Sequence, residues 1–529
     1  MSQARPVSPV GAWRLVARYP RVSALALGLL SATAFQPLGL WPLALAAMAA
    51  FAALIADAPD ARRAALLGWL FGWAHFTFGD NWIATAFTYQ AAMPAVLGWL
   101  AVPLLSLYLA LYPAVAALGA RAIAGRGLGW AFALAFAACW IVAEMLRASV
   151  FTGYAWNPFA MVLLGPLDRP GLAAIAPWTG TYALSGMAVL VAAGFALALA
   201  RRRWLAFAAA ALLGAAGMYL PAPASRPGPL AFTIVQPNLA QAQLENPASY
   251  AANFATLAAL SRPLHPGPRR LVLWPESGLP DYLRPGYPAG FYAQSTAYGD
   301  PALARQRLGR GIGPGSLLLT GAVDLALSGE RVTGAYNAVT AVDEAGAIRG
   351  GYAKAHLVPY GEYLPLRPVL EPLGLSRLVP GAIDFLPGPG PRTLDLGPWG
   401  KVAVQVCYEI VFSGEVVQRG TRPGVLFNDS NDGWFGAFGP PQHLAQARLR
   451  AIEEGLPVLR ATTTGISAVI DPHGVVRQYL SSHIAGRLDG QIPAALPPTL
   501  FARLGNVLPL LWAMVFLAAS GIAMRRRHR

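Results

Sequence analysis

The feature that most limits how this 529-residue chain can fold is a series of long apolar stretches with few or no charged side chains. Residues 22–56 hold no charged side chain, and Gln36-Pro37-Leu38-Gly39 divides them into two parts. Six further stretches have the same character, namely 64–84, 92–120, 128–146, 171–200, 204–220 and 504–524. Since about 20 apolar residues cross a bilayer, the sequence predicts an α-helical membrane bundle of about eight transmembrane helices.

These apolar stretches divide the chain into three parts. Seven of the predicted helices lie in residues 1–220, and the eighth, with a basic tail, lies in residues 504–529. Residues 221–503 between them are more polar, and they begin and end in proline-rich segments at 221–229 and 493–498. The sequence therefore predicts a membrane bundle, one large domain outside the membrane and a C-terminal transmembrane helix.

Arginine is distributed unevenly around the predicted helices, and this distribution predicts their orientation. Arginines cluster before the first helix and after the second, fourth, sixth and eighth: Arg5, Arg14, Arg18, Arg21, Arg62, Arg63, Arg121, Arg126, Arg201, Arg202, Arg203, Arg525, Arg526, Arg527 and Arg529. The opposite loops hold little beyond Arg147 and Arg169. The positive-inside rule then makes both termini cytoplasmic and exports residues 221–503. Much of the net charge of +15 lies in these flanks, so it does not indicate nucleic-acid binding.

Two charged residues at the end of the fifth predicted span need a separate interpretation, because a charge inside a membrane is costly. Glu144 and Arg147 are three residues apart and share one face of a helix. We expect them to pair with each other or to lie near the membrane surface. A polar cavity or a transport path is the alternative.

The pattern of apolar residues changes after residue 230 to short runs rich in β-branched residues. The predicted strands are 230–236, 270–274, 316–322, 335–342, 401–406, 424–427 and 466–470, and a helix is predicted at 442–454. Alternating strands and helices indicate an α/β domain. The segment contains no glycine-rich phosphate loop and no cluster of metal-binding residues, so no cofactor and no metal are expected.

Cys407 is the residue of this domain that most strongly suggests chemistry. It is one of two cysteines, and the other, Cys139, lies within a predicted membrane helix. Cys407 follows a strand-like run and is predicted to open a helix, whose N-terminal partial charge favours the thiolate. These features make Cys407 a candidate nucleophile.

Lysine and glutamate complete a set of candidate catalytic groups. Only two of the 40 basic residues are lysines, Lys354 and Lys401. In a chain that otherwise uses arginine, a lysine is expected where a compact ammonium group is required. Glu276 follows the predicted strand 270–274, and Glu362 lies eight residues after Lys354. A carboxylate, an ammonium and a thiol at strand ends supply a base, an oxyanion stabiliser and a nucleophile.

The same residues lie in motifs that resemble a known family, the apolipoprotein N-acyltransferases, whose exported domain is a member of the nitrilase superfamily. The three catalytic motifs are Trp274-Pro275-Glu276, Tyr352-Ala353-Lys354-Ala355-His356-Leu357-Val358-Pro359 and Val406-Cys407-Tyr408-Glu409. Further similar segments are Asn428-Asp429-Ser430-Asn431-Asp432-Gly433-Trp434-Phe435-Gly436, Gln442-His443, Glu144-Met145-Leu146-Arg147 and Thr152-Gly153-Tyr154-Ala155-Trp156. The resemblance covers nearly the whole chain.

This resemblance implies a fold and an activity. The fold would be a nitrilase-like α-β-β-α sandwich joined to the membrane bundle. The activity would be transfer of a fatty acyl chain from a phosphatidylethanolamine-like phospholipid, through a thioester on Cys407, to the α-amine of the diacylglyceryl-cysteine of an apolipoprotein. Glu276 would be the base and Lys354 the oxyanion stabiliser. Supporting roles are implied for Glu362, Tyr408 and Glu409.

The implied location is the bacterial cytoplasmic membrane, which the chain would cross several times with its catalytic domain on the periplasmic side. Both substrates are anchored in lipid, so the site must lie at the membrane surface. Two loops rich in apolar and aromatic residues, 279–292 and 360–378, are candidates to reach the membrane and gate lipid entry.

Two other functions are open at this point. A membrane-tethered nitrilase-like amidase would use the same catalytic residues on a small amide. A transporter with an accessory exported domain would need inverted repeats or broken helices around a central site, and no such symmetry is evident in the sequence.

Overall fold

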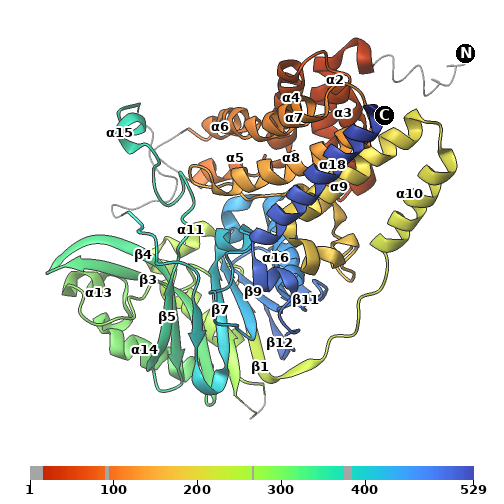
Figure 1. The fold of residues 1–529 in the computed structure, drawn as a ribbon. Helices are drawn as coiled ribbons and strands as arrows, with labels where there is room; N and C mark the ends of the chain where they lie inside the picture. Colours follow the sequence, from red (N-terminus) through yellow and green to blue (C-terminus); the bar gives the residue numbers. More distant parts are fainter. Residues whose placement is uncertain (1–15, 90–93, 265–266, 268, 374–383, 529) are drawn as a thin grey trace, which may run out of the picture.

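The computed structural model describes residues 16–89, 94–264, 267, 269–373 and 384–528, and Figure 1 shows their arrangement. A bundle of helices from the first 220 residues and the C-terminal helix lies beside a domain built from two β-sheets. Arg5 and Arg14, and residues 374–378 of the predicted second loop, lie outside the described residues.

Helices occupy all the predicted membrane segments. They are α2 (Pro20–Ala32), α3 (Trp41–Ala56), α4 (Ala61–Gly79), α5 (Ile83–Ala86), α6 (Val96–Leu109), α7 (Leu111–Ala124), α8 (Trp130–Ser149), α9 (Ala176–Ala200), α10 (Trp204–Met218) and α18 (Val507–His528). In the described part of the chain, four stretches are long and apolar enough to cross a membrane: Val96–Ala124, Trp130–Ser149, Leu172–Ala200 and Val507–Arg526. Three apolar helices, α2, α3 and α10, are shorter, so the total of eight spans stays a prediction.

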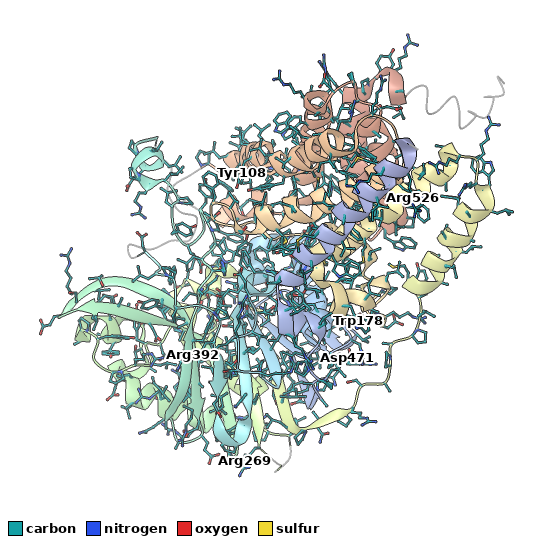
Figure 2. All side chains as sticks on the ribbon, viewed as in Figure 1. Tyr108, Trp178, Arg269, Arg392, Asp471 and Arg526 are labelled. Carbon is teal, nitrogen blue, oxygen red and sulfur yellow. The ribbon has the colours of Figure 1, made fainter. Side chains whose placement is uncertain are left out.

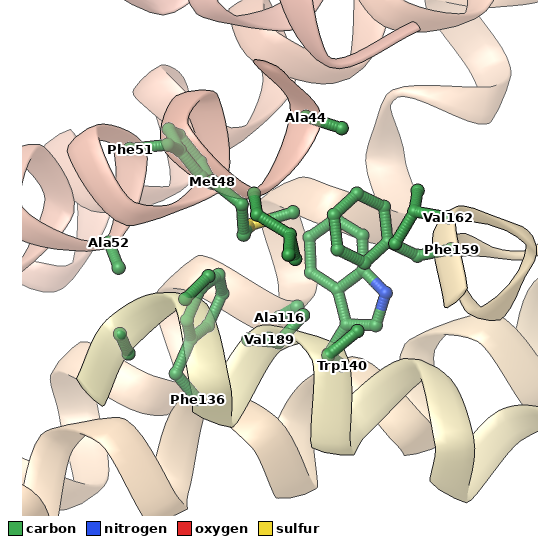
Figure 3. Close-up of a cluster of buried hydrophobic side chains, with 14 of the residues drawn as sticks. Ala44, Met48, Phe51, Ala52, Ala116, Phe136, Trp140, Phe159, Val162 and Val189 are labelled. Carbon is green, nitrogen blue, oxygen red and sulfur yellow. The ribbon is translucent and has the colours of Figure 1, made fainter. Parts of the chain in front are cut away.

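The bundle has its own hydrophobic core, which Figure 3 shows in close-up. Phe51 of α3 stacks on Phe71 of α4 with ring centroids 4.1 Å apart, and Phe136 of α8 meets Phe51 edge-on. Alanines such as Ala52 and Ala116 are fully buried between the helices. Small residues let helices approach closely, which is how membrane helices gain packing energy where no water drives association.

Residues 227–493 contain two six-stranded sheets. The first has the order β12-β1-β2-β3-β4-β5 and the second β11-β10-β9-β8-β7-β6. The strands are β1 (Pro227–Gln236), β2 (Arg270–Leu273), β3 (Ser316–Ser328), β4 (Arg331–Asp343), β5 (Ile348–Ala353), β6 (Thr393–Asp395), β7 (Lys401–Val406), β8 (Val425–Ser430), β9 (Val458–Thr462), β10 (Ser467–Ile470), β11 (Val476–Leu480) and β12 (Gly486–Pro493). In each sheet three neighbouring strands are parallel, β1-β2-β3 and β7-β8-β9.

The two sheets face each other across one core and are covered by helices. Ile234 and Leu319 of the first sheet share this core with Val404 and Phe427 of the second. A second core lies between the first sheet and helices α12 (Tyr250–Ser261) and α14 (Pro301–Ile312). The predicted α-β-β-α sandwich is therefore confirmed.

The outer helix of the second sheet, α16 (Gly439–Glu454), also contacts α9 of the bundle. It belongs to both regions, because its residues pack on β9 and β10 as well as on the membrane helices. All its described side chains except one are buried, and they include charged ones such as Arg448 and Glu453. The sandwich is thus joined to the bundle along a helix and not only at the ends of the chain.

Candidate active site

Three strand ends bring the predicted catalytic residues together between the two sheets. Glu276 follows β2, where Pro275 ends the strand because proline lacks an N–H donor. Lys354 follows β5, and Cys407 follows β7. Strands β2 and β7 belong to the parallel parts of the two sheets, whose carboxyl ends are the usual place for ligand sites.

Glu276 is held by side-chain and backbone donors from three segments. Its Oε1 accepts a hydrogen bond of 2.6 Å from Nδ2 of Asn337 on β4, and its Oε2 accepts one of 2.8 Å from the backbone N–H of Asn431. Nζ of Lys354 lies 3.9 Å from Oε1. Burial raises the pKa of Glu276, although Lys354 opposes this shift. A carboxylate with a raised pKa is a suitable proton acceptor.

Lys354 forms a short ion pair with the second carboxylate of the site. Its Nζ lies 3.0 Å from Oε1 and 2.9 Å from Oε2 of Glu362, and its side chain is 1% exposed. Burial alone would lower the pKa of Lys354, but the carboxylates of Glu362 and Glu276 outweigh burial and raise it. Lys354 is therefore a permanent cation that lies between two carboxylates.

Cys407 has an unusual backbone conformation. Its φ is +50°, in the left-handed region that non-glycine residues seldom adopt, and it opens a 3-10 helix of only five residues, Cys407–Val411. Burial raises its pKa well above the usual range, and the charge of Glu276 adds to this effect, while Lys354 and the nearby hydroxyl of Ser430 oppose it.

The prediction of a helix-stabilised thiolate is therefore wrong. The helix is a single short turn, and burial together with Glu276 raises the pKa of the thiol well above its usual range. Cys407 is a protonated thiol beside a carboxylate. Such a nucleophile requires a base, and Glu276 is the carboxylate with the largest electrostatic effect on it.

Glu409 lies behind the nucleophile, where it connects two loops. Its Oε1 accepts hydrogen bonds from the Tyr352 hydroxyl (2.7 Å) and from the backbone N–H of Ala355 (2.7 Å) and His356 (3.1 Å). Its Oε2 accepts from the N–H of Val406 at 2.8 Å. One buried carboxylate thus ties the segment after Lys354 to the segment before Cys407.

Tyr408 faces the membrane bundle. Its hydroxyl donates to the carbonyl of Gly153 at 3.2 Å, and its ring meets Phe412 edge-on. Gly153 belongs to the loop that follows α8. Tyr408 therefore links the nucleophile's segment to the membrane part of the chain.

Several residues near the site had no role assigned from the sequence. Asn337 donates to Glu276 and also to Glu362, at 2.9 Å. The sequence feature that could have identified Asn337 is a polar amide at an inward-facing position of an otherwise apolar strand. Asp429 on β8 is fully buried, and neither of its carboxyl oxygens has a hydrogen-bond partner among the described residues. Burial raises its pKa well above the usual range, and Glu276 adds to this shift.

The membrane part contains a second buried polar cluster, and its contacts differ from the expected ones. Glu144 Oε1 accepts hydrogen bonds from Trp140 Nε1 (3.0 Å) and from the N–H of Phe159 (2.8 Å). Arg147 donates to the carbonyl of Trp156 at 2.7 Å. The expected Glu144–Arg147 pair is absent from the ion pairs of the described residues, because each side chain binds the loop after α8 instead. In the same described ranges, no group of three or more His, Cys, Asp or Glu residues is arranged to hold a metal ion.

Comparison with known proteins covers both regions of the chain. The family model for the apolipoprotein N-acyltransferase N-terminal domain matches residues 27–194, and the model for carbon-nitrogen hydrolases matches residues 235–493. Among solved structures, that of Saccharomyces cerevisiae Nit3, a member of branch 10 of the nitrilase superfamily, is 18% identical with a TM-score of 0.35 and covers 50% of this chain and 90% of Nit3.

Curated relatives match over almost the full length. Apolipoprotein N-acyltransferase of Rhodopseudomonas palustris is 34% identical over 537 residues, which cover 96% of this chain and 95% of that protein. The enzyme of the same name from Bradyrhizobium diazoefficiens is 35% identical over 533 residues, with the same shares covered. The chain belongs to the apolipoprotein N-acyltransferase family.

Proposed function

We propose that this protein transfers a fatty acyl chain from a membrane phospholipid to the N-terminal amine of a lipid-modified apolipoprotein. The observation that carries the proposal is the buried set of Glu276, Lys354 and Cys407, within a chain that matches the acyltransferases at 34% identity over 96% of its length. A carboxylate, a fixed cation and a protonated thiol are the groups that acyl transfer through a covalent intermediate requires.

In the first step, Glu276 accepts the Cys407 thiol proton as the sulfur attacks the ester carbonyl of the phospholipid. The Lys354 ammonium stabilises the tetrahedral oxyanion. The carbon–oxygen bond of the ester then breaks, and Glu276 returns the proton to the departing oxygen. The products are a thioester on Cys407 and a lysophospholipid, and we expect the donor to resemble phosphatidylethanolamine.

In the second step, the neutral α-amine of the diacylglyceryl-cysteine attacks the thioester carbonyl. Glu276 accepts a proton from the attacking nitrogen, the carbon–sulfur bond breaks, and the thiol is regenerated. Glu362 keeps Lys354 charged and in place through contacts of 2.9–3.0 Å. Glu409 positions the loops on both sides of the nucleophile, and Tyr408 contributes the contact with the bundle.

The membrane topology is part of the same proposal. Residues 1–220 form seven transmembrane helices, residues 221–503 form the periplasmic catalytic domain, and residues 504–529 return the chain to the cytoplasm. Figure 2 supports this arrangement, since Arg526 at the end of α18 and Arg269 in the sandwich lie at opposite ends of the molecule. This separation fits an inner membrane protein with cytoplasmic termini.

The loop after Glu362 is a candidate entrance for lipid. It contains α15 (Arg367–Leu370), which lies at the level of α6 in Figure 1, above the sandwich. Leu366 and Val369 are 63% and 60% exposed there. The other candidate loop, 279–292, ends within α13 (Ala289–Ser295). This helix lies beside the first sheet, on the side away from the membrane bundle. We therefore propose that only the loop after Glu362 reaches the lipid.

Mass spectrometry of the detergent-purified protein tests this function. We expect incubation with phosphatidylethanolamine to add a fatty-acyl mass to the Cys407 peptide, and a diacylglyceryl lipopeptide to discharge it. The Cys407→Ala variant should insert in the membrane and acquire no adduct. If the wild-type protein forms no adduct but releases ammonia from small amides, it is an amidase and the proposal fails.

A further inference from the structure

Behind the nucleophile lies a fully buried network that the proposed reaction does not use. Nε2 of His443, on α16, is 3.0 Å from the backbone carbonyl oxygen of Cys407. Nδ1 of the same ring lies 3.0 Å from a terminal nitrogen of Arg460 and 3.1 Å from Oδ1 of Asp432. These three side chains are 0–2% exposed. The network therefore touches the nucleophile through its main chain.

The contacts and the charges around His443 together indicate its protonation state. A carbonyl oxygen only accepts hydrogen bonds, so Nε2 must carry a hydrogen. Nδ1 faces both a donor, Arg460, and an acceptor, Asp432, so its contacts are compatible with either state. Burial and the charge of Arg460 lower the pKa of His443 and outweigh Asp432, which raises it, so the ring carries only the hydrogen on Nε2. His443 is thus a neutral imidazole whose single N–H points at Cys407.

Arg460 and Asp432 fix the ring in this orientation. The same terminal nitrogen of Arg460 lies 2.7 Å and 2.5 Å from the two oxygens of Asp432. Burial alone would raise the pKa of Asp432, but Arg460 outweighs burial and holds it well below the usual range. Ser430, which also neighbours the Cys407 thiol, donates to Asp432 at 2.7 Å. The charges of this ion pair are matched, so the network adds no net charge to the active site.

The neighbouring residue, Gln442, attaches the same turn of α16 to the membrane part. Its Oε1 accepts from Trp156 Nε1 at 2.8 Å and from Asn157 Nδ2 at 2.9 Å, and its Nε2 donates to the carbonyl of Gly79 at 3.2 Å. Gln442 therefore binds the bundle, and the next residue, His443, binds the backbone of Cys407. The position of Cys407 depends on how the bundle and the sandwich are joined.

Cys407 needs such a restraint because its backbone is strained. Cys407 lies in the left-handed region, with φ +50°, and a non-glycine residue stays in that conformation only when its surroundings hold it. A backbone rotation that relieved this strain would move the carbonyl group of Cys407. The His443 hydrogen bond opposes that rotation.

We propose that His443 is a positioning residue of the acyl transfer, which holds the Cys407 carbonyl through its Nε2–H and thereby keeps the sulfur aligned with Glu276 and Lys354. This inference takes its substrate from the proposed function, whereas the contact between His443 and Cys407 is independent of that function. It predicts that a side chain with a donor at the Nε2 position can replace His443, whereas one with a donor at the Nδ1 position cannot.

Two amide variants of the full-length protein separate these cases. Glutamine in His443→Gln places an N–H donor near the position of Nε2, and asparagine in His443→Asn ends about one bond short. We expect His443→Asn to slow alkylation of Cys407 by iodoacetamide and thioester formation from phosphatidylethanolamine by about 100-fold, because misplacement by about 1 Å has that effect. His443→Gln should recover most of both rates. His473→Asn, in a turn away from the site, is the matched control.

The two rates distinguish the possible failures. If His443→Asn reacts as fast as wild type, or if both variants are equally slow at an unchanged apparent Tm, His443 only fills space and the proposal is wrong. If wild type forms no thioester while the two variants still differ in alkylation, the proposed acyl transfer fails and the positioning role stands.

A measurement on the wild-type protein covers the case in which the variants do not fold. The chain has only two cysteines, so labelling cysteine carbonyls with 13C and histidine with 15N isolates the contact by solid-state NMR. We expect a dipolar coupling between a cysteine carbonyl and a protonated Nε2 whose ring has a bare Nδ1. An imidazolium, a proton on Nδ1 or the lack of such a coupling would overturn the assignment.

Discussion

The sandwich domain and the helical bundle each bury a cluster of charged side chains, but the two clusters bind different partners. In the sandwich, Lys354 lies between the carboxylates of Glu276 and Glu362, so charges face charges. In the bundle, Glu144 accepts from an indole and a backbone N–H, and Arg147 donates to a backbone carbonyl. The charges there face neutral groups of α8 and of the loop that follows it.

This difference separates a reactive site from a structural one. Opposing charges around a protonated thiol keep a base, a cation and a nucleophile available to a substrate. Glu144 accepts both of its hydrogen bonds, from Trp140 and from the N–H of Phe159, on Oε1, and through Phe159 it holds a loop in place. That loop carries Gly153 and Trp156, which contact Tyr408 and Gln442 of the catalytic domain. The bundle therefore supports the site without contributing a reacting group.

Loss of the nucleophile should have the largest effect. Cys407→Ala removes the atom that forms the thioester, and activity should fall by about 10⁴–10⁶-fold, as for other covalent catalysts. Acyl transfer to a lipopeptide measures the loss. Cys139→Ala, within α8, is the matched control and should retain activity, so equal losses in the two variants would contradict the assignment.

Glu276→Gln should have the next largest effect. The amide preserves the size of the side chain and can still accept from the N–H of Asn431, but it cannot accept the thiol proton. We expect a loss of about 10²–10⁴-fold in the rate of thioester formation. The apparent Tm should change little. A variant that still forms the thioester at the wild-type rate would identify another base.

Lys354→Arg tests whether a compact cation is needed. The guanidinium preserves the charge, but the 1% exposed site has no room for its planar group. We expect about 10²–10³-fold lower kcat, the range for loss of one oxyanion donor. Lys401→Arg, at the solvent-exposed start of β7, is the control and should leave kcat unchanged.

Glu144→Ala tests the structural interpretation of the membrane cluster. The change leaves the Trp140 and Phe159 donors without an acceptor, and each such loss costs about 1–3 kcal/mol. The apparent Tm in detergent should fall, while the alkylation rate of Cys407 per folded molecule should stay within a few-fold of wild type. A normal Tm with abolished chemistry would show that the two clusters are functionally alike.

Asp429→Asn should have the smallest effect, and only on the pH dependence of stability. The pKa of Asp429 is raised in the folded protein, so the folded state binds the proton more tightly than the unfolded state does. Its contribution to stability is therefore lost as the pH rises from the unfolded value, near 4, through the raised folded value. The variant should flatten the fall of apparent Tm over this pH range. An unchanged slope would assign that fall to other groups.

Some strands could be predicted from the sequence and others could not. Strands such as β2, β3 and β7 are buried on both faces, so their runs of Val and Leu predict them directly. Strands β5 and β11 lie at the edges of the two sheets and are partly exposed, with glycine or charged residues in their sequences. Their extended form depends on hydrogen bonds to a neighbouring strand, which local sequence does not reveal.

The sequence by itself predicted which stretches enter the membrane, because the preference for lipid is a property of each stretch of about 20 residues. It also identified Glu276, Lys354 and Cys407 as the candidates for chemistry, through their motifs. Only the tertiary structure showed that burial raises the pKa of the Cys407 thiol, that Glu144 and Arg147 bind other partners, and that Nε2 of His443 lies 3.0 Å from the Cys407 carbonyl oxygen. Ionisation and hydrogen bonding depend on which groups folding places within a few ångströms of each other, and on how much water it removes from around them.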